Sequence, residues 1–268
     1  MIPPLSQAPP PARPAGEEPF LLGEWEVPRS LAYLAIGLPL AALLYMVACG
    51  LLSFGAQLLF HETGHAAAGW LCGHPAIPSA RGFTAFPPRR LPIVFVVFGG
   101  ILYGAWSLRD TPPAAIALGV AAVVQLLLSL SPLREDFFSL GGHLGELLFA
   151  CLFLWRGAQG GFSQEWERPL YAMLGWCLWF KATLFLWGLL TDLNALQMYE
   201  TGPSMAGGDN DLVKVSDSWG WKLRSVAGLL LVLQAAGLCL TLGLWWKIAG
   251  KPLPQRAAGP AGGYPPLP

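Results

Sequence analysis

The chain has 268 residues, of which 54% are hydrophobic and only 12% are charged, and its mean hydropathy is +0.50. Soluble domains carry about 25% charged residues, so this composition excludes a typical soluble globular protein. Its high hydrophobicity also excludes disorder as the main state. Sixteen basic and sixteen acidic residues cancel, which excludes a strongly basic nucleic-acid-binding protein. The composition therefore indicates an integral membrane protein.

Seven apolar runs between two proline-rich ends define the predicted organisation. Residues 1–29 contain eight Pro and four Glu, and residues 250–268 contain six Pro, so both ends are predicted to be flexible tails. Residues 30–249 are predicted to form one transmembrane helical domain, because a spanning helix needs roughly 20 apolar residues. The runs cover residues 31–50, 51–72, 91–108, 113–130, 139–155, 170–190 and 223–248.

The pattern of these runs predicts an all-α, polytopic transmembrane helical bundle. No run shows the strict two-residue alternation of a membrane β-barrel. The first two runs have no polar loop between them, so the sequence predicts either six or seven spans. Two longer connections, residues 73–92 and 191–222, are candidate gates. We expect a multi-pass protein of the plasma (inner) membrane, surrounded by the lipid bilayer.

The second apolar run carries the motif with the clearest chemistry, His61-Glu62-Thr63-Gly64-His65, which is an HExxH sequence. Residues i and i+4 share one face of a helix, so both imidazoles can bind the same ion. Glu62 can accept a proton from a water activated by zinc and deliver it to a leaving amine. Ionisable residues inside an apolar run are costly unless they are paired, and a metal would offset that cost. The motif therefore predicts a Zn²⁺ site.

Residues 58–69, with the sequence LLFHETGHAAAG, resemble the active-site helix of the site-2-protease-type intramembrane metalloproteases. Those enzymes place HExxH within a membrane helix, often with Gly before the second His and small residues after it. The resemblance covers these twelve residues and the polytopic layout. It implies that His61 and His65 ligate zinc and that Glu62 is the catalytic base. It also implies a membrane protein or peptide substrate that is cleaved within the membrane.

The third metal ligand has more than one candidate. His143 and Glu146, in the fifth run, lie at i and i+3 on one helix face between small residues. Either could complete a three-ligand zinc site. The resembled family instead takes its third ligand from an Asp in a later helix, within an Asn-Pro…Asp-Gly segment. Asp209 and Asp211 are the corresponding candidates here, although Asn and Leu follow them instead of Gly.

The leading prediction is a membrane-embedded zinc metalloprotease, and two other functions stay open. Glu62-x-x-His65 is an ExxH sequence and His143-x-x-Glu146 is its reverse, and di-iron bundles combine two ExxH helices with two further Glu residues. The remaining Glu residues lie in predicted tails or loops, so a membrane di-iron oxidoreductase is the less favoured alternative. The other alternative is a non-catalytic membrane scaffold that binds the metal. No cofactor other than a metal and no nucleic-acid partner is predicted.

Overall fold

A computed structural model describes residues 20–22, 25–47, 51–79, 83–159, 163–202 and 210–249 of the chain. This part of the chain contains nine α-helices and two antiparallel β-hairpins, and all seven predicted apolar runs are helical. The helices are α1 (Arg29–Val47), α2 (Leu51–Leu71), α3 (Leu91–Ser107), α4 (Pro112–Leu130), α5 (Arg134–Ala158), α6 (Glu167–Thr191), α7 (Leu193–Thr201), α8 (Asp211–Trp219) and α9 (Leu223–Ala249). The paired strands are β1 (Phe20–Leu22) with β2 (Trp25–Val27), and β3 (Ile77–Ser79) with β4 (Phe83–Ala85).

Five of these helices, α1, α4, α5, α6 and α9, are long and apolar enough to cross a membrane. Helix α3 is apolar but only 17 residues long, and α2 contains the polar HExxH motif. The chain is therefore a helical membrane protein with five candidate spans in the described residues. The predicted total of six or seven spans is not confirmed.

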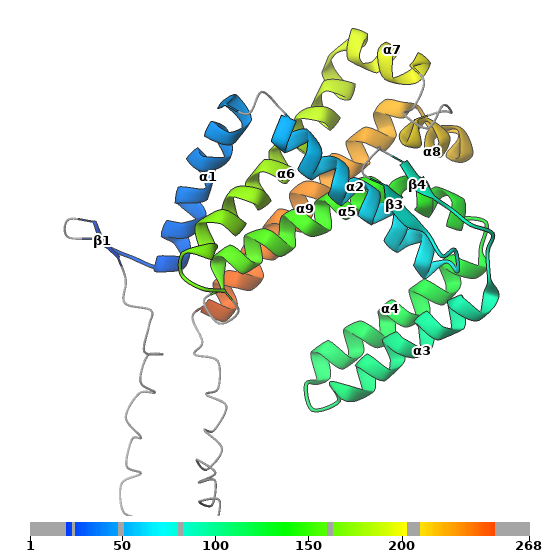
Figure 1. Ribbon diagram of the computed structural model, residues 1–268, viewed down its shortest axis with the longest axis horizontal. Coiled ribbons are helices and arrows are strands. Elements are labelled where there is room, and N and C mark those ends of the chain that lie inside the picture. The colour runs from blue at the N-terminus through cyan, green and yellow to red at the C-terminus, as the bar shows by residue number, and fades with distance from the viewer. Residues whose placement is uncertain are drawn as a thin grey trace, which may run out of the picture.

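Helix α5 is the centre of the bundle (Figure 1). It packs along α6 and α2, and it also contacts α1, α8 and α9. One buried apolar cluster joins α6, α8 and α9 through Leu189, Leu212 and Val226. A second cluster joins α1 to α5 through Leu34 and Leu154. Apolar packing therefore anchors the nine-residue helix α8 to two of the candidate spans, α6 and α9.

Helices α2 and α5 approach each other closely because glycines face each other where they cross. A Cβ built on Gly145 would lie 2.5 Å from the Cα of Gly64, which is closer than real side chains permit. A Cβ built on Gly141 would lie 2.9 Å from the Cβ of Ala68. Small residues at such positions let helix backbones come together. The α5 backbone consequently lies directly against the helix that carries HExxH.

Short elements occupy the two long connections predicted from the sequence. The β3–β4 hairpin lies in the connection after α2 and packs against α2, where the indole of Trp70 donates a hydrogen bond to the Ala76 carbonyl. Helices α7 and α8 lie in the connection between α6 and α9. The β1–β2 hairpin falls within the stretch predicted to be an N-terminal tail. Residues 1–19 and 250–268 lie outside the described residues.

Candidate metal centre

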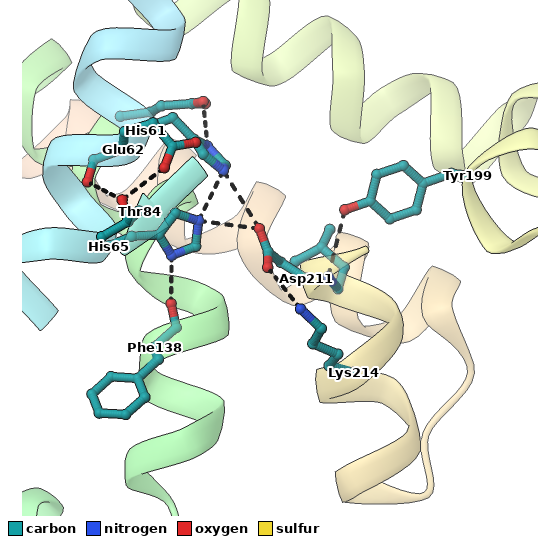
Figure 2. A network of polar contacts seen from close by, with 10 residues as sticks. His61, Glu62, His65, Thr84, Phe138, Tyr199, Asp211 and Lys214 are labelled. Carbon is teal, nitrogen blue, oxygen red and sulfur yellow. Dashed lines mark hydrogen bonds and ion pairs between the residues drawn. The ribbon is translucent and has the colours of Figure 1, made fainter. Parts of the chain in front are cut away.

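The two histidines of HExxH direct their rings toward each other from one face of α2 (Figure 2). Their Nε2 atoms are 3.1 Å apart, and their ring centroids are 4.7 Å apart in an edge-on arrangement. His65 is buried and His61 is half-buried. The four-residue spacing of an α-helix is the reason that two imidazole nitrogens meet at one point.

A carboxylate from a distant part of the chain completes this cluster. Asp211 is the first residue of α8, and its Oδ2 atom lies 3.1 Å from Nε2 of His65 and 3.5 Å from Nε2 of His61. The three atoms form a triangle between α2 and α8 (Figure 2). The Asp211 side chain is 27% exposed, so solvent can reach the cluster from the side of α8.

Polar contacts at both ends of α8 hold its first residue against the histidines. At the N-terminal end, the amide Nδ2 of Asn210 donates to the carbonyls of Tyr199 and Gly202, at 2.6 and 3.0 Å. At the other end, the indole of Trp219 donates a 2.8 Å hydrogen bond to Asp136 in the first turn of α5. Together with the apolar cluster beneath α8, these contacts fix the carboxylate relative to α2 and α5.

The charged surroundings keep Asp211 ionised. Burial alone would raise the pKa of this carboxyl, but its hydrogen bonds to His61 and His65 outweigh burial and hold the pKa well below its usual range. The Lys214 ammonium lies 3.7 Å from the other carboxylate oxygen, Oδ1, one turn along α8. Asp211 therefore presents an anionic oxygen to the two imidazoles at neutral pH.

The Nδ1 atoms of both histidines, here called the outer ring nitrogens because they point away from the three-atom cluster, contact hydrogen-bond acceptors. Nδ1 of His65 is 2.6 Å from the backbone carbonyl of Phe138, and Nδ1 of His61 is 2.8 Å from the carboxylate of Glu146. Glu146 is only 1% exposed. Assigned from these partners, a neutral ring carries its proton on Nδ1 and its lone pair on Nε2. Metal-binding histidines are oriented in the same way, by an acceptor on the nitrogen that does not bind the metal.

These donors fit a small divalent cation. Ligand atoms placed 2.0–2.1 Å from an ion at tetrahedral corners are about 3.3 Å apart. The edges of the observed triangle, 3.1, 3.1 and 3.5 Å, bracket that value. When both rings are neutral with the proton on Nδ1, their Nε2 atoms no longer donate hydrogen bonds to Asp211. Two lone pairs and one anionic oxygen then converge, which favours a cation between them. His61, His65 and Asp211 are thus a group that could hold a metal ion.

The two predicted residues of α5 lie next to this triangle. Glu146 binds the outer nitrogen of His61, and the ring of His143 has its centroid 4.9 Å from that of His61 and stacks on Phe185. His61, His143 and Glu146 form a second group that could hold a metal, with His61 common to both. Asp209, the other predicted Asp, lies outside the described residues.

Glu62 is buried beside the histidines and bonds to the β3–β4 hairpin. The residue is 4% exposed. Its carboxylate Oε2 accepts a 2.7 Å hydrogen bond from the hydroxyl of Thr84 in β4 (Figure 2). The general base predicted by the motif is therefore held by a residue outside the motif.

Several contacts that position the site were not found from the sequence. Thr84, the Phe138 carbonyl and Trp219 each act on a residue that is distant along the chain. A backbone carbonyl has no sequence signal, and a single Thr or Trp is too common to stand out. Asn210, adjacent to Asp211, was the one local signal available.

Comparison with known proteins assigns no family to the chain. No protein-family model, curated protein or solved structure matches it. The functional argument therefore depends on the geometry of the site.

Replacing Gly142 with Ala tests how tightly α5 closes on the histidines. A Cβ at Gly142 would collide with the ring of His61 and lie 2.6 Å from Nε2 of His65. Forcing a methyl group into a packed site costs roughly 1–3 kcal/mol, so we expect metal affinity to fall about tenfold or more as the rings are displaced. Gly99→Ala is the control, because nothing lies within 4 Å of a Cβ there. Equal metal affinity in both variants would contradict the close packing.

Replacing Glu146 with Gln tests its role as the residue that orients His61. The change removes the charge that accepts from Nδ1 of His61 and keeps the shape. Loss of such an outer partner typically weakens metal affinity about 10- to 100-fold. Glu135→Gln, at an exposed position on the same helix, is expected to leave affinity unchanged. Competition with a fluorescent zinc chelator measures both values, and equal affinities would contradict the orienting role.

Proposed function

We propose that the protein is a membrane-embedded zinc metallopeptidase that hydrolyses peptide bonds at or within the membrane. The observation that carries the proposal is the convergence of Nε2 of His61, Nε2 of His65 and Oδ2 of Asp211, with both outer ring nitrogens held by acceptors. Two imidazoles, one carboxylate and an open fourth position make up the usual ligand set of a catalytic zinc site. In this proposal Asp211 is the third ligand and Glu146 orients His61.

The remaining residues have roles that follow from their positions. When bound, zinc supplies Lewis acidity, which makes water nucleophilic near neutral pH and polarises a peptide carbonyl. Glu62, beside both histidines in the motif, accepts the proton of the attacking water on its carboxylate and delivers it to the leaving amine. The buried surroundings of Glu62 and His65 exclude bulk solvent, while the partly exposed Asp211 marks the side from which water enters.

The substrate class follows from the surroundings of the site. The cluster lies between α2, α5 and the short helix α8, in a molecule whose described helices include five candidate spans. A membrane protein or membrane-associated peptide is therefore the substrate we propose, with the plasma (inner) membrane as the location.

A membrane di-iron oxidoreductase is the second candidate. The observation that favours it is the additional group formed by His61, His143 and Glu146. Di-iron bundles use four carboxylates, however, and the described carboxylates within these two groups are only Asp211 and Glu146. This candidate requires two irons per chain, which a metal analysis distinguishes from one zinc.

Chelation tests the proposed chemistry. The purified chain is reconstituted in phosphatidylcholine–phosphatidylglycerol vesicles with a panel of labelled single-span peptides, and fragments are identified by mass spectrometry. We expect cleavage that 1,10-phenanthroline abolishes and that added Zn²⁺ restores. Cleavage that survives complete metal removal, or no cleavage of any peptide by the zinc-loaded protein, would contradict the proposal.

A further inference from the structure

The carboxylate of Glu62 has one defined hydrogen-bond partner in the described part of the chain. The Thr84 hydroxyl lies 2.7 Å from Oε2 of Glu62 and 3.0 Å from the backbone carbonyl oxygen of the same residue. No other described side chain hydrogen-bonds this carboxylate, and Oε1 receives no hydrogen bond from the described residues. Among the described residues, Thr84 thus engages one oxygen of Glu62 and none engages the other.

The hairpin that carries Thr84 is itself fixed to α2. Thr84 pairs with Pro78 across the two strands. At the base of the hairpin, the Trp70 indole donates to the Ala76 carbonyl, and the His74 amide donates to the Gly69 carbonyl at the end of α2. These contacts give the Thr84 hydroxyl a defined place beside the HExxH helix. Its bond to Glu62 is therefore built into the fold, and it joins residues that are 22 positions apart.

We propose that Thr84 is a positioning residue that orients the Glu62 carboxylate for proton transfer. The inference rests on the proposed hydrolytic function. With Oε2 held by the hydroxyl, the carboxylate cannot rotate freely, and Oε1 remains as the oxygen that accepts a proton from water. A general base acts efficiently only when it is held within hydrogen-bond reach of the proton it removes. Misplacement of a reacting group by about 1 Å can cost roughly 100-fold in rate.

The inference makes a specific kinetic prediction. Thr84→Val keeps the shape of the side chain and removes the hydroxyl, so we expect kcat to fall roughly 10- to 100-fold while KM and zinc content stay at wild-type values. Thr84→Ser restores the hydroxyl and is expected to recover most of kcat. Thr183→Val is the matched control, because among the described residues this half-buried hydroxyl bonds only within its own helix, to the Trp179 carbonyl.

An infrared measurement tests the contact without relying on activity. The difference spectrum between wild type and Glu62→Gln identifies the carboxylate bands of Glu62. We expect Thr84→Val to shift these bands and Thr84→Ser to return them, because carboxylate stretching responds to hydrogen bonding. An unshifted band in Thr84→Val would overturn the inference even if the wild type cleaves peptides.

The kinetic outcomes separate the inference from the proposed function. If the wild type cleaves and Thr84→Val retains full kcat, the positioning role is wrong and the proposed function stands. If Thr84→Val loses zinc or unfolds and Thr84→Ser recovers zinc binding and folding, the hydroxyl has a structural role and the inference is overturned. A wild type that carries zinc but cleaves no peptide contradicts the proposed function and removes the catalytic role assigned to Thr84.

Discussion

Glu62→Gln is expected to abolish peptide cleavage and to leave the zinc in place. The substitution keeps the size and one carbonyl oxygen of the side chain, but an amide cannot accept a proton from water at neutral pH. General acid–base groups contribute about 10²- to 10⁴-fold to enzymatic rates, so residual activity should fall by at least two orders of magnitude. Zinc content should not change, because Glu62 is outside the triangle formed by His61, His65 and Asp211.

The control and the contrary outcomes for Glu62→Gln are well defined. Glu135→Gln, on the exposed face of α5, should cleave at the wild-type rate. Loss of zinc together with activity in Glu62→Gln would make Glu62 a ligand instead of a base. If Glu62→Gln changes no measurable property of the zinc-loaded protein, the result would support the non-catalytic scaffold, in which the motif only holds a metal.

Asp211→Ala is expected to remove the third metal ligand and with it most of the bound zinc. Its Oδ2 is the anionic member of the triangle, at 3.1 Å from His65 and 3.5 Å from His61. Loss of an outer partner typically weakens zinc affinity about 10- to 100-fold, and loss of a direct ligand should exceed that range. Cleavage should be lost in parallel, because two histidines alone do not retain the ion at ordinary zinc concentrations.

A neighbouring aspartate provides the matched control for this experiment. Asp217 lies on the exposed side of the same helix, so Asp217→Ala should retain zinc and activity. Circular dichroism and thermal unfolding of both variants establish that α8 remains folded. Retention of zinc in Asp211→Ala, together with its loss in Glu146→Ala, would transfer the role of third ligand from α8 to α5.

The sequence predicted the helices and the two histidines well because both depend on local patterns. Each apolar run became a helix, from α1 to α6 and α9, within a few residues of its expected ends. Likewise, the four-residue spacing in HExxH is enough to bring His61 and His65 together on one face. The number of spans was harder to predict, because α3 is short and α2 is interrupted by polar residues.

The proposed third ligand, Asp211, could not be selected from the sequence because its place depends on contacts between distant elements. Asp211 reaches His65 across 146 positions. The packing of Leu212, the hydrogen bonds of the Asn210 amide and the bond from Trp219 to Asp136 place α8 there. Glu146 and His143 have suitable spacing on α5, yet that spacing does not show whether they contact the inner or the outer nitrogen of His61. Helices α7 and α8, each nine residues long, are too short to give a strong periodic signal.

The glycines of α5 illustrate a signal that the sequence contained but could not fully explain. Gly141, Gly142 and Gly145 indicated a close approach by another helix. The structure identifies that helix as α2 and shows that Gly142 provides the space for both imidazole rings. A glycine that faces a cluster of histidine rings and one that faces only another backbone look the same in the sequence.

Elemental analysis of the detergent-purified protein, with His65→Ala as the control, tests the central claim most directly. The account predicts about one zinc per chain in the wild type, as expected for a single three-ligand site, and its loss in the variant. Two irons per chain would contradict the metallopeptidase and favour the oxidoreductase. A wild-type protein that binds no metal, even after incubation with Zn²⁺, would contradict the assignment of His61, His65 and Asp211 as a metal centre.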